Sequence, residues 1–441
     1  MPTQRPPSAA SPMLRTTQQA PEPKAISGLP PLVPVAEALA IVRDCVQPHR
    51  RMEAVSLALA AGRILAVDAL ADLDQPAFPR SMMDGIAVRS ADCLGEMPRL
   101  VGAGASPAGS PHTTPVVPGT FVRVMTGGVV PPGADSVVPV ERITRIDGDA
   151  CDPATGTWQI NAPVRPGQHV ALKGSEVRCG DLVVPAGERL GGARLGALAS
   201  FGHAEVSVAA RPNVAVLPTG TEIVSVSSTP GLGQVRNSNA YALAALFDRF
   251  GARSVVADTV IDDAPVLAAA LLQAAAESDL VVTCGGVSMG DYDLVVGALN
   301  ALGAEQHFHR VSLKPGKPVL FATLNGTPVL GLPGNPVSAT VGALLFGRTA
   351  VARLLGSRRE RWIQITATAA DAMRGVGPRE EMRPGLWSEW EGRAAVAPVH
   401  MAGSADLAHF AGGDALIRRA PHAAAVEAGG AVDVWLWPEA P

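Results

Sequence analysis

The stretch most suggestive of chemistry reads Thr-Cys-Gly-Gly-Val-Ser-Met-Gly-Asp-Tyr-Asp and covers residues 283–293. It directly follows three apolar residues, so we predict a buried strand that ends in an open loop. Consecutive N–H groups around Gly285, Gly286 and Ser288 can surround an anion. Asp293 and the carboxylate two positions before it could hold a divalent cation against that anion. The segment therefore indicates phosphate or oxyanion chemistry.

Two further loops and a lysine turn suit the same chemistry. The loop Pro-Thr-Gly-Thr-Glu ends in the carboxylate of Glu222. The loop Leu-Pro-Gly-Asn-Pro-Val-Ser contains Pro336 and ends at Ser338, where a helix is expected to start and its N–H groups would attract an anion. A Lys-Pro-Gly-Lys-Pro turn adds the ammonium groups of Lys314 and Lys317. Together these groups suit a phosphorylated ligand with a metal ion.

The elements that must position these loops lie in residues 211–356, where strand and helix patterns alternate. Alternation of this kind predicts a parallel, doubly wound α/β sheet. Ligands bind such a sheet beyond the carboxyl ends of its strands, so the three loops should share one edge. We predict strands at 214–217, 254–260 and 279–283, and helices at 264–277, at 293–302 and from an Asn237 or Ser238 cap to a stop at Gly251.

Residues 76–160 have a different sequence pattern, in which short β-like runs are interrupted by glycine and proline. This pattern predicts a small β domain. It contains Ser-Met-Met-Asp-Gly-Ile-Ala-Val, which sets Asp84 before a glycine. It also contains Arg-Val-Met-Thr-Gly-Gly, which sets Thr126 at a turn. Read singly, each segment is most simply a hairpin turn.

Composition excludes several classes of function. The chain has 441 residues, of which 47% are hydrophobic, enough for about three domains. Its formal net charge of -4 and its 4% aromatic content give no reason to expect a nucleic-acid partner. The five cysteines form no CxxC pair, so neither a disulfide framework nor a zinc site is indicated. With no leader pattern and no apolar run approaching a membrane span, we expect a soluble cytoplasmic protein.

Some polar residues have simpler explanations than a site. The Asp262-Asp263 pair precedes a helix and favours an N-cap over a metal role. His307 and His309 lack a third ligand at suitable spacing, which favours a surface or core pair. Cys284 is most simply a small residue at a strand end.

Six motifs occur here in order: the two β-domain segments, Gly-Ala-Asp-Ser-Val-Val-Pro-Val-Glu, Cys-Gly-Gly-Val-Ser-Met-Gly-Asp-Tyr-Asp, Lys-Pro-Gly-Lys-Pro and Gly-Leu-Pro-Gly-Asn-Pro-Val-Ser-Ala. Through them the chain resembles the molybdopterin molybdenumtransferases, the MoeA-type molybdenum insertases that include the gephyrin E domain. The resemblance covers roughly residues 32–440.

The resemblance implies an elongated homodimer with four subdomains per chain, one of them discontinuous. The fold class is then α/β plus β, with a doubly wound molybdopterin-binding α/β domain, small β domains and a C-terminal β-barrel. We assign a disordered tail (1–31), a discontinuous linker domain (32–75 and 163–210), a small β domain (76–162), the α/β domain (211–356) and the barrel (357–441).

The implied reaction inserts molybdate into adenylylated molybdopterin and releases AMP and molybdenum cofactor, with a divalent cation such as Mg²⁺. By resemblance, the catalytic residues are Asp84, Thr126, Glu222 and Asp293, the first two supplied by the partner chain, and the metal ligands are Glu222, Asp293 and one of Asp262 and Asp263. Substrate would be bound by Gly285, Gly286, Ser288, Lys314, Lys317, Pro336 and Ser338.

One departure from the family pattern bears on the metal, because Thr221 stands where an Asp is common. Segments 377–383 and 403–407 also resemble family motifs, and we assign them to structure and dimer shape. Further partners implied are a molybdopterin adenylyltransferase and acceptor molybdoenzymes. The alternatives are that the chain is itself a molybdopterin adenylyltransferase, or a non-catalytic molybdopterin-binding scaffold.

Overall fold

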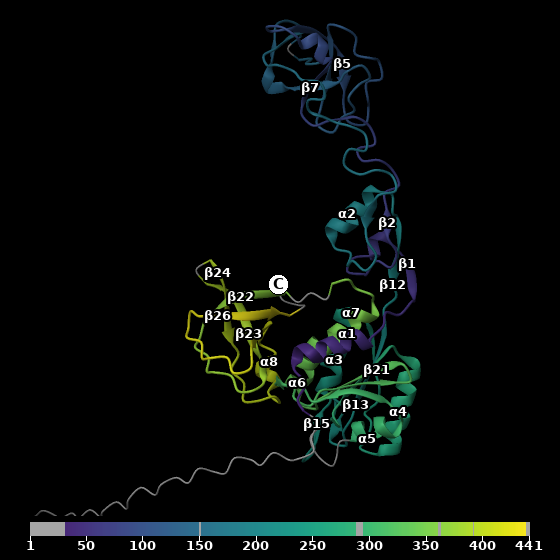
Figure 1. Cartoon of the computed structure of the whole chain (residues 1–441), viewed down its shortest axis with the longest axis vertical. Helices are drawn as coiled ribbons and strands as arrows, with labels where there is room; N and C mark the ends of the chain where they lie inside the picture. Colours follow the sequence, from purple (N-terminus) through teal and green to yellow (C-terminus); the bar gives the residue numbers. More distant parts are fainter. Residues whose placement is uncertain (1–30, 150, 288–293, 360–362, 391, 438–441) are drawn as a thin grey trace, which may run out of the picture.

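The computed structural model describes residues 31–149, 151–287, 294–359, 363–390 and 392–437. The predicted tail at 1–31, except for its last residue, lies outside the described residues, as do Ser288 and Asp293. The chain is elongated, with the small β domain at one end, the linker domain in the middle, and the α/β domain at the other end beside the C-terminal barrel (Figure 1).

The α/β domain has a six-stranded sheet in the order β16-β13-β17-β21-β20-β18. Four strands run parallel, as predicted for a doubly wound sheet, and β20 and β18 add antiparallel pairs beside them. The cause is the Asn325-Gly326 hairpin, in which both residues have positive φ (52° and 85°). The strands are β13 (Asn213–Pro218), β16 (Arg253–Val256), β17 (Leu280–Cys284), β18 (Glu305–His309), β20 (Leu320–Leu324) and β21 (Thr327–Leu332).

Helices cover both faces of this sheet, as a doubly wound fold requires. They are α3 (Ser238–Phe250), α4 (Ala264–Glu277), α5 (Leu294–Ala301) and the continuous run α6 (Pro336–Gly342), η4 (Ala343–Gly347) and α7 (Arg348–Leu354). The run from Pro336 to Leu354 is long and apolar enough to cross a membrane, but 83% of its most apolar window is buried in the fold. Its length and composition are therefore those of a core helix.

The predicted limits of these elements agree with the described ones to within one residue, except at the second strand. Asn237 caps α3 by accepting the Ala240 N–H, and Gly251 ends it with a φ of 107°. The strand predicted at 254–260 ends at Val256, because the ladder is interrupted and resumes only as a bridge between Val260 and Thr219. The helix predicted from residue 293 is described from Leu294.

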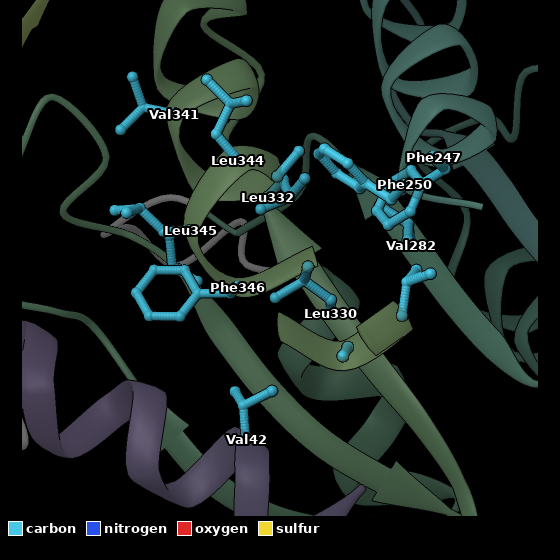
Figure 2. Close-up of a cluster of buried hydrophobic side chains, with 14 of the residues drawn as sticks. Val42, Phe247, Phe250, Val282, Leu330, Leu332, Val341, Leu344, Leu345 and Phe346 are labelled. Atoms are coloured by element: carbon cyan, nitrogen blue, oxygen red, sulfur yellow. The ribbon is translucent and has the colours of Figure 1, made fainter. Parts of the chain in front are cut away.

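Helix α1 (Val35–Cys45), from the first segment of the predicted linker domain, packs against the α/β domain. Its buried residues include Val35, Leu39 and Val42, which join the core that contains Phe346 and Leu354 of the α/β domain. Figure 2 shows Val42 facing this cluster. An apolar stripe at helical spacing demands a partner face but does not identify it, so the sequence could not place this helix.

The linker domain builds one small core from two distant chain segments. Strand β1 (Met52–Ser56) pairs with β12 (Glu205–Ala209), and β2 (Ala69–Leu70) pairs with β11 (Leu182–Val184). Leu65, Leu190 and Val208 are among the buried residues of this core, beside α2 (Gly192–Ser200).

The small β domain has a sheet in the order β7-β4-β6-β5-β9-β8, packed around residues that include Phe121 and Val138. Its strands are β4 (Gly85–Val88), β5 (Arg99–Ser106), β6 (Thr120–Val124), β7 (Ser136–Pro139), β8 (Ile143–Arg145) and β9 (Thr157–Ile160). A short pair, β3 (Arg80–Ser81) with β10 (Val170–Ala171), lies next to the Met-Asp-Gly segment.

The C-terminal domain is a closed barrel, because β23 pairs with both β24 and β25. Its strands are β22 (Ile363–Ala369), β23 (Glu380–Trp390), β24 (Arg393–Pro398), β25 (Ala415–Arg419) and β26 (Ala431–Leu436). The short helix α8 (Leu407–Phe410) lies between β24 and β25 in the chain. The α/β domain adds strand β19 (Leu313–Lys314), which pairs with β23. The predicted lysine turn therefore lies at the junction of the two domains.

Candidate active site

The three predicted loops meet at the carboxyl ends of β13, β17 and β21. The Thr219 N–H donates to the Cys284 carbonyl at 3.0 Å, and the Gly285 N–H donates to the Leu332 carbonyl at 3.0 Å. The Thr219 hydroxyl adds a 3.3 Å bond to the same Cys284 oxygen. The shared edge expected of a doubly wound sheet is therefore present, and the loops are joined by hydrogen bonds between their backbones.

The Gly285-Gly286 bend depends on having no side chains. Gly285 has a φ of 109°, and a Cβ there would lie 2.3 Å from the Thr219 carbonyl oxygen. Gly286 has a φ of 63°, and its Cβ would lie 2.8 Å from Cγ2 of Val295. Both glycines are therefore needed for the close approach of the loops. Ser288 and Asp293, predicted on the same loop, lie outside the described residues.

The two neighbouring aspartates have different roles in the structure. Asp263 is the N-cap of α4 and accepts the Val266 N–H at 3.1 Å. Asp262 instead accepts the Thr221 N–H at 3.1 Å and the Thr221 hydroxyl at 3.3 Å. Asp262 therefore lies against the loop that carries Glu222, whereas Asp263 satisfies a helix end.

Within the part of the chain that the structure describes, no three His, Cys, Asp or Glu side chains gather as a metal site. Glu222 and Asp262 are both exposed and belong to adjoining loops. Their oxygens are the donor type that suits a hard cation such as Mg²⁺.

The two lysines of the turn differ in surroundings. Lys314 is exposed and its Nζ lies 3.0 Å from Oε1 of Glu381, across the junction with the barrel. Lys317 is partly buried, and its pKa is lowered by burial and then by the nearby charges of Arg310 and Arg379. Three cationic groups brought together in this way repel one another, and a bound anion would relieve that repulsion.

The first turn of α6 is only partly open to a ligand. The C-terminal domain contacts this turn through Ser404. The Ser404 carbonyl accepts a hydrogen bond from the Val337 N–H at 3.1 Å, and its hydroxyl accepts one from the side-chain amide of Asn335 at 2.9 Å. Pro336 carries no N–H, and Ser338 is only 4% exposed. The segment around Ser404, which we assigned to structure and dimer shape, therefore lies at the site itself.

Sequence reasoning also missed Arg310 and Arg379. Neither belongs to a glycine-rich loop, and Arg379 comes from the chain segment leading into β23, where its Nη1 donates to the Leu313 carbonyl at 3.2 Å. The signal available was the Gly377-Pro-Arg-Glu-Glu-Met-Arg383 motif, which resembled a family segment but had no assigned partner.

Asp84 and Thr126 form a direct pair in the small β domain. Asp84 Oδ1 accepts the Thr126 N–H at 2.7 Å and the Thr126 hydroxyl at 3.0 Å. The bond from the Thr126 N–H lowers the pKa of Asp84 most, and the bond from the Thr126 hydroxyl lowers it further. The nearby charge of Arg123 adds a smaller decrease. Asp84 is exposed and is thereby held as a carboxylate at neutral pH.

Within one chain, the Asp84–Thr126 pair and the loops of the α/β domain are not brought together. The linker domain separates the two domains that carry them (Figure 1). A site that uses both sets of residues therefore needs a second chain.

Replacing Thr126 by valine should raise the pKa of Asp84 toward its ordinary value, because the hydroxyl bond is lost while the backbone bond remains. If activity needs the carboxylate, the acid side of its pH profile should move to higher pH. The matched control is Thr120→Val, which removes a hydroxyl bond to the Val117 carbonyl in the same domain and should leave the profile unchanged. Identical profiles for the native protein and both variants would contradict the assignment.

Comparisons with known proteins agree over three long segments of the chain. Residues 33–202 match the model of the MoeA N-terminal region (domain I and II), residues 215–353 a probable molybdopterin binding domain, and residues 366–437 the MoeA C-terminal region (domain IV).

Individual relatives agree with these models. A molybdopterin molybdenumtransferase from Nostoc sp. is 34% identical over 370 residues, covering 81% of this chain and 83% of the relative. Molybdopterin molybdenumtransferase 2 from Mycobacterium tuberculosis is 36% identical over 330 residues, covering 70% of this chain and 80% of the relative. The crystal structure of a molybdopterin biosynthesis moeA protein from Pyrococcus horikoshii has a TM-score of 0.76 at 25% identity and covers 92% of this chain and 100% of its own. The chain therefore belongs to the molybdopterin molybdenumtransferase family, the transferases of molybdenum cofactor biosynthesis.

Proposed function

We propose that this transferase inserts molybdate into adenylylated molybdopterin, cleaves the pyrophosphate link, and releases AMP and molybdenum cofactor. The proposal is carried by the meeting of the three loops at one sheet edge, with the turn that bears Lys317 beside them, where a Cβ on Gly316 would lie 3.6 Å from the Ser338 carbonyl oxygen. Both the pyrophosphate group and molybdate are anions, so their approach to each other requires positive charge and N–H donors at one place. The sheet edge supplies both.

The site is completed, in this proposal, by the Asp84–Thr126 pair of a second copy of the chain. The support is the distance between the small β domain and the α/β domain within one chain (Figure 1). Asp84, kept charged by Thr126, would face the cationic edge of the partner and act on the reacting groups there. The protein would then be a homodimer with two shared clefts.

Glu222 and Asp262, together with Asp293, are the residues proposed to hold Mg²⁺. The oxygen-only donor set fits the ion. When bound, Mg²⁺ would neutralise negative charge on the pyrophosphate. We also propose that the protein works in the cytoplasm, where it would receive its substrate from a molybdopterin adenylyltransferase and pass its product to acceptor molybdoenzymes.

The test is to mix purified protein with adenylylated molybdopterin, Mg²⁺ and molybdate and to measure AMP and molybdenum cofactor. Molybdate-dependent release of AMP with formation of the cofactor is the expected result. Consumption of ATP with release of pyrophosphate would instead identify an adenylyltransferase. Tight binding of the adenylylated pterin without any AMP would identify a non-catalytic scaffold.

Replacing Thr221 by aspartate should tighten Mg²⁺ binding about tenfold, because a second carboxylate would then lie next to Asp262. The Mg²⁺ dependence of AMP release measures the change. Thr221→Asn is the matched control, since it adds an oxygen without a charge and should have a smaller effect. An unchanged Mg²⁺ requirement in Thr221→Asp would argue against a metal at this loop.

A further inference from the structure

Asn239, the second residue of α3, contacts two of the substrate loops at once. Its Nδ2 donates to the Gly334 carbonyl at 2.7 Å and to Sγ of Cys284 at 3.0 Å. An amide nitrogen carries two N–H groups, so both of its donors are used. Cys284 ends strand β17, and Gly334 precedes helix α6. One side chain therefore joins the loop after β17 to the loop after β21.

The Cys284 thiol completes this link. Its Sγ donates in turn to the Pro333 carbonyl at 3.4 Å, so the thiol and the amide hold adjacent residues of one loop. Cys284 is 1% exposed, and burial raises the pKa of its thiol to about 12. The sulfur therefore stays protonated and serves as a neutral hydrogen-bonding group, which argues against a nucleophilic or metal-binding role.

The start of α3 is itself fixed to the third loop. The Glu222 carbonyl accepts the Val235 N–H at 2.9 Å, and the Val224 carbonyl accepts the Asn237 N–H at 3.0 Å. These bonds belong to the short parallel pair β14 (Ile223–Val224) and β15 (Val235–Arg236), which leads directly into the helix. A shift of any one of the three loops would therefore be transmitted to Asn239.

Among the described residues, the backbone hydrogen bonds that join these two loops are confined to the strand ends. The bond from the Gly285 N–H to the Leu332 carbonyl is at the end of the β17–β21 ladder. After it, the Gly334 carbonyl is held by Asn239, and Asn335 is held by Ser404 of the barrel. Asn239 therefore sets how far the loop of residues 333–335 stands from the Gly285-Gly286 bend.

We infer that Asn239 is a positioning residue of the active site, which fixes the spacing between the two anion-binding loops and so the affinity for the phosphorylated substrate. The inference rests on the proposed function for the identity of that substrate. The effect of Asn239 passes through its bonds to Gly334 and Cys284.

The test measures binding of adenylylated molybdopterin by titration, separately from AMP release. Asn239→Ala should weaken binding about 3- to 10-fold, the effect of losing a hydrogen bond of ordinary strength. In steady state the loss should appear mainly in KM and less in kcat. Asn239→Asp, which keeps the shape but turns acceptors toward the Gly334 carbonyl, should bind more weakly than Asn239→Ala.

Two further variants separate positioning from general packing. Asn300→Ala removes an exposed asparagine from α5 in the same domain and should bind as the native protein does. Cys284→Ala removes only the sulfur, and combining it with Asn239→Ala should weaken binding less than the two single effects multiplied, because both act through one link.

Native affinity in both Asn239 variants would overturn the inference, as would a loss of kcat alone. Because binding is measured directly, the result is independent of catalysis. Failure of the native protein to release AMP would count against the proposed function and leave the binding comparison intact.

Discussion

Replacing Asp84 by asparagine is expected to reduce molybdate-dependent AMP release roughly 100-fold or more, the scale on which a positioned acid or base contributes. Asparagine has the size of aspartate, and its oxygen can still accept the Thr126 N–H and hydroxyl. The variant therefore removes the negative charge and leaves the turn in place. Single-turnover AMP release, with adenylylated molybdopterin and molybdate at saturation, measures the effect on the chemical step.

The matched control is Asp149→Asn, in an exposed loop of the same domain where Asp149 accepts the Cys151 N–H at 2.9 Å. We expect activity within about twofold of native and thermal unfolding within the small range typical of surface changes. If Asp84→Asn kept native activity, the small β domain would have no part in the chemistry, and the reading of Asp84 and Thr126 as hairpin residues would be the correct one.

Replacing Gly285 by alanine is expected to cost roughly 2–5 kcal/mol of folding free energy and to abolish substrate binding. The left-handed backbone costs an alanine about 1–2 kcal/mol, and overpacking adds about 1–3 kcal/mol. The added Cβ would lie 2.3 Å from the Thr219 oxygen, so the loops after β13 and β17 must move apart. Denaturant unfolding measures the first effect, and titration with adenylylated molybdopterin measures the second.

Gly297→Ala is the control for this change. Gly297 lies in α5 of the same domain, and a Cβ there would meet nothing within 4 Å. Alanine in a helix interior should stabilise the domain by roughly 0.5–1 kcal/mol and leave binding unchanged. Equal stability and equal binding in Gly285→Ala and Gly297→Ala would mean that the loops tolerate separation, contrary to the structure of the site described above.

The sequence predicted those features of the fold that local chemistry controls. Helix α4 has the predicted limits, because Asp263 caps it and its apolar residues recur at helical spacing. Gly251 and the Asn325-Gly326 turn have the positive φ angles that their residue types favour. The common edge of the three loops followed from the rule for doubly wound sheets, which depends only on the order of strands and helices.

Features that depend on long-range packing could not be predicted in the same way. The apolar face of α1 is evident from Val35, Leu39 and Val42, but its partner is formed by α7 and η4, some 300 residues later in the chain. Ser404 and Arg379 reach the site from the barrel domain, and no local pattern in their segments states which loop they meet. Asn239 lies in the first turn of α3, and no local pattern indicates that its amide donates to the Gly334 carbonyl.

A mixture of two inactive variants tests most directly whether one insertase site is assembled from two chains. Asp84→Asn and Glu222→Gln chains would be co-expressed and purified through one tag common to both chains, so that all dimers are recovered, and molybdate-dependent AMP release would be measured. Random pairing makes half of the dimers mixed, and each mixed dimer has one cleft with both residues intact. We expect about a quarter of native activity from the mixture and almost none from either variant alone. No recovery in the mixture, with both chains folded and paired, would contradict a site shared between chains.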